Sequence, residues 1–137
     1  MSNPQAALTR FGAPPTAEDI VELAEQALTA MPAKLRRVVR GVAILVEETP
    51  DDETLAELGI ENAWDLTGLY RGVPIGEKGS AATPHEPDMV LLYREPILLE
   101  WIETGEELFN LVRTVLIHEI AHHFGFNDAD IEDLEKE

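Results

Sequence analysis

The sequence of 137 residues predicts a single α+β domain, in which one small mixed sheet packs against a central helix. Apolar residues recur at helical spacing over 16–31 and again over 104–124. Three short aliphatic runs are typical of strands: 38–46, 69–73 and 89–94. No internal repeat or linker divides the chain, so we expect residues 16–137 to form one domain after a flexible segment, 1–15.

The first half of the chain predicts a helix, a strand and a second, shorter helix. Thr16 is placed to cap the first helix, with Asp19 as a capping-box partner, and Pro32 ends its apolar pattern. The run 38–46 is apolar on both faces, as expected of a strand inside a sheet. Residues 51–58 then predict a short acidic helix.

The middle of the chain is less regular. Residues 59–87 are rich in glycine and proline, with only a brief strand at 69–73, and a loop of this length is often functional. Residues 89–94 predict a strand that Pro96 ends, and a helical turn at 97–102 is expected to follow.

The longest helix is expected near the C-terminus. Thr104 is its predicted N-cap, and the apolar pattern continues to Phe124, where Gly125 suits the position after a helix end. A last short helix is expected to start near Asp130, with Asp133 at its third position.

The composition restricts the chemistry that the chain can perform. There is no cysteine, which excludes disulfides, a thiol nucleophile and every cysteine-based metal site. Any metal must therefore be bound by carboxylates and by the four histidines, which are His85, His118, His122 and His123.

The charge restricts the expected partners. A net charge of −17, from 27 acidic and 10 basic residues, opposes binding to nucleic acid and to anionic membranes. No apolar run approaches the roughly 20 residues that span a bilayer, and the N-terminus lacks the apolar region of an export signal. We therefore expect no nucleic-acid or membrane partner and a cytoplasmic location.

One motif stands out in the longest predicted helix. His118-Glu119-Ile120-Ala121-His122 has the H-E-x-x-H pattern. Residues four apart lie one turn apart on one helix face, so both imidazoles can reach a single ion. Glu119 is rotated by about 100° from His118, too far to join easily as a ligand but near a water on that ion.

The motif continues beyond the helix. Gly125 allows the chain to turn, and Asp128 is then placed to bring a carboxylate to the same ion. Asp130 is the alternative third ligand, but we favour it as the N-cap of the last helix. Two histidines, one aspartate and an open fourth position are typical of a catalytic zinc site, with Glu119 as general base.

This extended motif resembles the zinc motif of metzincin-type peptidases in its variant with aspartate as third ligand. The chain as a whole is similar to the small bacterial zincin-like metallopeptidases, often described as minimal zincins. Two upstream segments support the likeness: 68–74 (GLYRGVP) and 90–97 (VLLYREPI). The resemblance implies a minimal zincin fold and a zinc-dependent peptidase with ligands His118, His122 and Asp128 and general base Glu119.

Each candidate also has a plain structural interpretation. His118 and His122 could be hydrogen-bonded core residues, and the other two histidines are expected at the surface, with His85 as an alternative extra ligand. Tyr70 and Tyr93 are expected to pack in the interior, although either could donate to an oxyanion. The strand at 89–94 is expected to be ordinary; alternatively, it is an exposed edge to which a substrate adds by backbone pairing.

Three functions are compatible with the motif. Hydrolysis of a peptide or protein substrate is favoured. The alternative is a regulatory or interaction domain that keeps zinc for stability, because only nine residues follow Asp128 where metzincins continue into a further subdomain. Metal-dependent RNA cleavage is disfavoured by the charge of −17 and by Glu119. The sequence specifies neither the substrate nor the oligomeric state.

Overall fold

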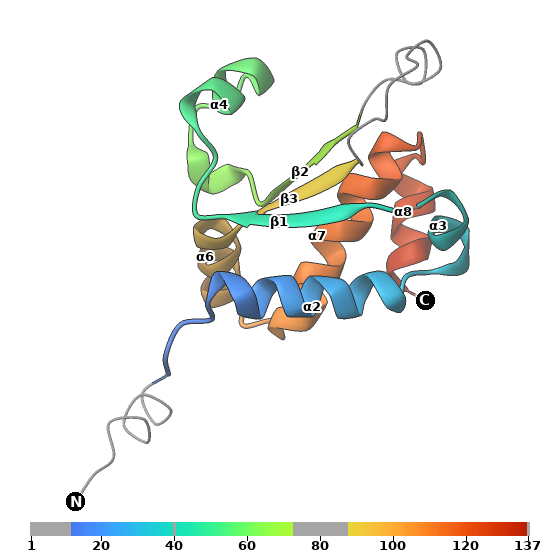
Figure 1. Ribbon diagram of the computed structural model, residues 1–137, viewed down its shortest axis with the longest axis horizontal. Helices are drawn as coiled ribbons and strands as arrows, with labels where there is room; N and C mark the ends of the chain where they lie inside the picture. The colour runs from blue at the N-terminus through green and yellow to red at the C-terminus, as the bar shows by residue number, and fades with distance from the viewer. Residues whose placement is uncertain (1–11, 40, 73–87, 137) are drawn as a thin grey trace, which may run out of the picture.

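The computed structural model describes residues 12–39, 41–72 and 88–136. The elements in chain order are α2 (Ala17–Thr29), α3 (Ala33–Val38), β1 (Ala43–Glu47), α4 (Asp52–Leu58), the 3₁₀ turn η1 (Ala63–Asp65), β2 (Gly68–Arg71), β3 (Met89–Tyr93), α6 (Arg94–Thr104), α7 (Leu108–His123) and α8 (Asp128–Glu135). Helices and a small mixed sheet are arranged around α7 (Figure 1). The predicted α+β class is confirmed.

The sheet has the strand order β1-β3-β2. β1 runs parallel to β3, with Leu45 opposite Leu91, and β2 runs antiparallel to β3, with Leu69 opposite Leu91. The central strand β3 is the most buried of the three. The alternative that residues 89–94 form an exposed edge is therefore wrong, and β2 and β1 form the edges.

The first strand is shorter and more exposed than the sequence predicts. β1 begins only at Ala43, and Leu45 is 46% exposed because β1 is an edge strand. The preceding residues, Ala33–Val38, form α3, with Pro32 as its N-cap. Proline ends one helix but also suits the start of the next, because its fixed φ is already helical and its missing N–H is not needed there.

The two helices that follow β3 also differ from the prediction. Pro96 does not end the strand; it lies in the first turn of α6, where proline is tolerated. Thr104 is the last residue of α6 and not a cap of the long helix, because Gly105 adopts φ 68° and separates the two helices. α7 therefore starts at Leu108, with Glu107 as its N-cap.

One predicted cap is confirmed, and the structure adds a second. Thr16 and Asp19 form a capping box at the start of α2, through hydrogen bonds of 2.8 and 3.1 Å. Asp51 caps α4 by accepting a hydrogen bond from the Thr54 amide at 2.7 Å. Both helices therefore begin where side-chain oxygens satisfy otherwise unpaired backbone amides.

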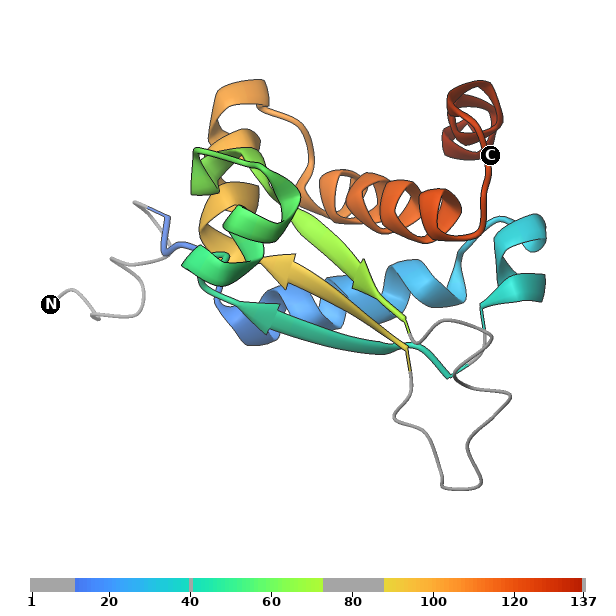
Figure 2. The ribbon, with the colours of Figure 1, turned by 90° about the horizontal axis from the view of Figure 1, so that it is seen from above.

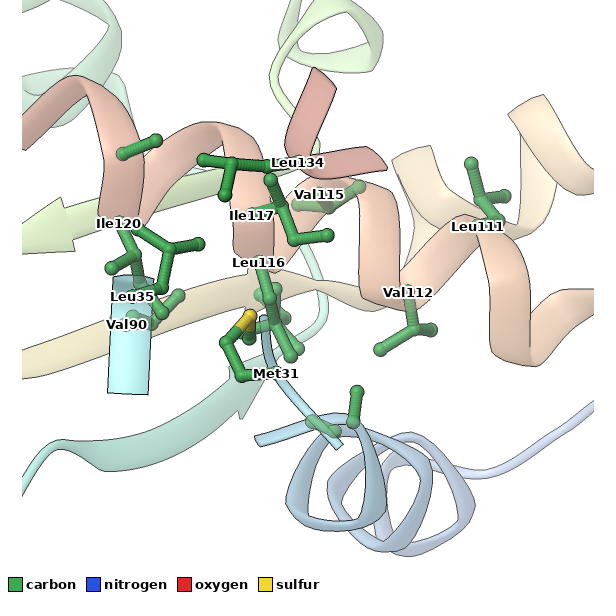
Figure 3. Close-up of a cluster of buried hydrophobic side chains, with 14 of the residues drawn as sticks. Met31, Leu35, Val90, Leu111, Val112, Val115, Leu116, Ile117, Ile120 and Leu134 are labelled. Atoms are coloured by element: carbon green, nitrogen blue, oxygen red, sulfur yellow. The ribbon is translucent and has the colours of Figure 1, made fainter. Parts of the chain in front are cut away.

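Helix α7 passes through the middle of the core. It contacts β2, β3, α2, α3, α6 and α8, and Figure 2 shows it beside α2 with the sheet alongside both. Its buried side chains are Leu111, Val112, Val115, Leu116, Ile117, Ile120 and Ala121. Figure 3 shows several of them meeting Met31, Leu35, Val90 and Leu134 from the surrounding elements. The predicted central position of this helix is confirmed.

Two of the predicted segments fall largely outside the described residues. These are most of the segment 1–15 and the second part of the loop 59–87, together with His85. Within the described ranges, no helix has the length and apolar character needed to cross a bilayer.

We expect Leu116→Ala to lower the free energy of unfolding by about 2–5 kcal/mol, because it leaves a cavity in the centre of the core. Ile102→Ala is the control, since Ile102 is 73% exposed and its truncation should change stability by no more than about 0.5 kcal/mol. Urea unfolding measures both. Equal losses in the two variants would contradict the central position of α7.

Candidate metal centre

The last turns of α7 present the H-E-x-x-H side chains together. The rings of His118 and His122 are 5.9 Å apart between centroids and nearly perpendicular, at 80°. Leu111 and Val115, on the same stripe of the helix, are buried. The two histidine side chains are instead about half exposed, so this stripe passes from the core to the surface before the helix ends.

Asp128 lies beside His122. Its Oδ1 atom is 3.5 Å from Nε2 of His122, although its side chain is 98% exposed. The chain reaches this position through Gly125, whose φ of 83° belongs to the left-handed region that favours glycine. The Phe126 amide then donates to the Ala121 carbonyl at 2.9 Å, which closes the turn at the end of α7.

The last helix starts earlier than the sequence predicts. Asn127 is its N-cap, and Asp130 is the third residue of a capping box, with hydrogen bonds of 2.8 and 3.3 Å to Asn127. Asp130 is therefore part of the helix start but is not its N-cap. The same arrangement makes Asp128 the first helical residue, whose side chain takes no part in the capping box.

His118 contacts a residue that the sequence analysis did not identify. Its Nε2 atom lies against Oε1 of Glu135, at the end of α8. The three predicted ligands are thus divided between a His122–Asp128 pair and a His118–Glu135 pair. Across the ranges 12–39, 41–72 and 88–136, no three histidine or acidic side chains form a group that could hold a metal ion.

The donor chemistry nevertheless suits zinc. Two imidazole nitrogens and nearby carboxylate oxygens are typical ligands of zinc in proteins without cysteine ligands. Oε1 of Glu135 is shielded from solvent and has no hydrogen-bond partner among the described residues. Its neighbour is Nε2 of His118, and burying a carboxylate oxygen beside a neutral imidazole costs free energy, which a cation at this position would offset.

Glu119 lies between the histidines and the sheet. Burial raises the pKa of its carboxyl group, while a hydrogen bond from the backbone of Tyr70 and the charges of His122 and His118 act in the opposite direction. Because a carboxylate can only accept, the Tyr70 amide is the donor. The general-base candidate is thus partly buried and is held by the edge strand β2.

A small cavity lies beside these residues. It has a volume of about 240 Å³, and its lining consists of Thr67, Glu100, Thr114, Val115, His118 and Glu119. A larger hollow of about 330 Å³, between the end of α2 and the start of β1, contains none of the motif side chains. The cavity at the motif is therefore the place where a ligand could meet both His118 and Glu119.

The two tyrosines are engaged elsewhere. The Tyr70 hydroxyl donates to Asp88 Oδ2 at 2.8 Å, and its ring stacks on His123 with centroids 3.9 Å apart. Tyr93 is buried in β3, as the packing interpretation predicts. His123 is exposed and points to Tyr70 and Phe124, consistent with the predicted surface position.

Glu135 could have been found in the sequence. It follows Asp128 by seven residues, and positions seven apart return to the same face of a helix after about two turns. What the sequence could not show is how α8 lies along α7. That depends on Ile131 and Leu134, which are buried in the core that α7 dominates.

The comparisons with known proteins identify the family. Residues 39–137 match the family described as zincin-like metallopeptidase, and the chain belongs to it. Among solved structures, a conserved hypothetical protein from Thermo thermophilus is similar, with 28% sequence identity and a TM-score of 0.51. The match covers 80% of this chain and 94% of that one, which supports a single-domain minimal zincin fold. A search of curated proteins found no match.

Close packing between β2 and α7 maintains the wall of the cavity. A Cβ atom on Gly68 would lie 2.7 Å from Cγ1 of Val115 and 3.3 Å from the Leu91 carbonyl oxygen. We expect Gly68→Ala to lower the free energy of unfolding by about 1–3 kcal/mol because of this overlap.

The overlap can be tested by a double-mutant cycle. Val115→Ala should relieve part of it, so that the two changes couple by about 0.5–3 kcal/mol. Urea unfolding of the four proteins gives the coupling. Additive effects would show that Gly68 does not need to approach Val115 closely.

Proposed function

We propose that the chain is a zinc-dependent metallopeptidase that hydrolyses peptide bonds in a peptide or protein substrate. His118, His122 and Asp128 are the proposed zinc ligands, and Glu119 is the proposed general base. One observation carries this proposal: a partly buried glutamate lies next to two histidines of the same helix, at a cavity that Glu119 and His118 both line. Zinc, when bound, supplies a Lewis acid and lowers the pKa of water to about 7.

The chain's own residues have distinct tasks in this proposal. Glu119 accepts a proton from the attacking water and passes it to the leaving amine. The Tyr70 amide holds its carboxylate toward the cavity, and partial burial raises its pKa, which makes it a stronger base than an exposed glutamate. Val115 supplies the aliphatic part of the cavity wall beside His118 and Glu119.

A second candidate function is a zinc-binding regulatory or interaction domain with little proteolytic activity. It is favoured by the contact between His118 and Glu135, which brings a fourth protein group to the motif. A zinc site in which protein groups fill all four coordination positions is typical of structural zinc. Zinc that raises the melting temperature, with no cleavage across a broad peptide library, would support this function over the first.

Zinc content tests the ligand set. We expect about one zinc per chain in the purified protein by elemental mass spectrometry and much less in Asp128→Ala. Asp130→Ala is the matched control: it removes a neighbouring carboxylate that belongs to the capping box, so it should keep its zinc while α8 becomes less stable. If Asp130→Ala lost its zinc and Asp128→Ala kept it, Asp130 and not Asp128 would be the third ligand.

Glu119→Gln tests the general base. This variant keeps the size of the side chain and an oxygen that can accept from Tyr70, so it should bind zinc as the wild type does. Its kcat on a cleavable peptide should fall by about 10²–10⁴-fold, because the amide cannot accept a proton. Glu107→Gln, at the exposed start of α7, should have wild-type activity. Undiminished turnover by Glu119→Gln would refute the mechanism.

A further inference from the structure

The side chain of Glu135 faces the metal-binding side of the motif. Oε1 of Glu135 meets Nε2 of His118, and Oδ1 of Asp128 is near Nε2 of His122. Both carboxylates thus approach the same type of ring nitrogen. A carboxylate that only orients a ligand histidine binds the other nitrogen of the ring, opposite the metal. Glu135 is therefore placed as a ligand would be, not as an outer partner.

Glu135 is held in this position by the packing of α8. The flanking residue Leu134 and the residue one turn earlier, Ile131, are both buried in the core. Nη1 of Arg113, on α7, donates to the main-chain carbonyl of Glu135 at 3.4 Å. The last turn of α8 is thus fixed to α7, unlike the exposed side chain of Asp128 at the other end of the helix.

The carboxylate of Glu135 is paired with an imidazole. Oε1 is removed from solvent and contacts Nε2 of His118, a pair in which the imidazole is charged only when it is protonated. Such an oxygen is destabilising unless it is paired with positive charge. A divalent cation shared with His118 would provide that charge.

We propose that Glu135 is a fourth protein ligand of the metal, supplied by the last turn of α8. This proposal rests on the zinc site proposed above and extends it. With four protein ligands the site is closed, whereas catalytic zinc sites keep one position open. Glu135 must therefore withdraw from the metal before a peptide can be hydrolysed, and the end of α8 controls access to the site.

Metal affinity tests this proposal on the full-length chain. Apo-protein is titrated with Zn²⁺ against a chromophoric chelator and with Co²⁺ by visible absorption, for the wild type, Glu135→Ala and Glu132→Ala. Glu132 is the matched control, because it lies on the same helix, carries the same charge and points to Lys136 at 3.9 Å. Glu135→Gln is added because it preserves the size of the side chain if the alanine variant unfolds.

We expect Glu135→Ala and Glu135→Gln to bind Zn²⁺ at least about tenfold more weakly, since loss of even an outer partner costs about 10–100-fold. The Co²⁺ spectrum should also change, because water replaces a carboxylate. Glu132→Ala should match the wild type in both measurements. Equal or tighter binding by the Glu135 variants would overturn the proposal and leave the peptidase function standing, whereas a wild type that binds no metal would refute both.

Discussion

The burial of α7 is the constraint on which the rest of the structure depends. Its apolar side chains must be covered on nearly every side, and α2, the sheet and α8 each cover a part of the helix. Because hydrophobic burial is the main favourable contribution to folding, this helix determines where its neighbours can lie. The polar end of the same helix carries the motif. The backbone of His118 and Glu119 is therefore held in place by the core beneath it, which favours a precise site.

Local signals in the sequence predicted those elements that local chemistry determines. The capping box at Thr16 could be identified because a side chain three residues from its amide partner forms the bond wherever the helix lies. Pro32 follows the end of α2 as predicted but also begins α3, whereas Pro96 was wrongly interpreted as a terminator, since proline stops one element and can equally begin the next. The edge position of β1 could not be predicted, because strand order is decided by partners distant in sequence.

The residues of the site also differ in how far the sequence could predict their positions. The spacing of His118 and His122 along one helix specifies their proximity, and the turn at Gly125 directs the chain toward His122. The contact between Glu135 and His118 depends instead on how α8 docks through Ile131 and Leu134, which is a property of tertiary packing. Burial of Glu119 under β2 is likewise invisible to helical periodicity, although it is what raises the pKa of that carboxyl group.

The hydrogen bond between the Tyr70 amide and Glu119 has a consequence beyond the chemistry of the site. β2 is an edge strand, and an unpaired backbone donor on such an edge can pair with another chain and start aggregation. Glu119 accepts a hydrogen bond from this donor, and α7 contacts β2. The Tyr70 amide is therefore not available to pair with a strand of another chain. The proposed general base thus also protects a strand edge, which restricts substitution at this position for a reason unrelated to catalysis.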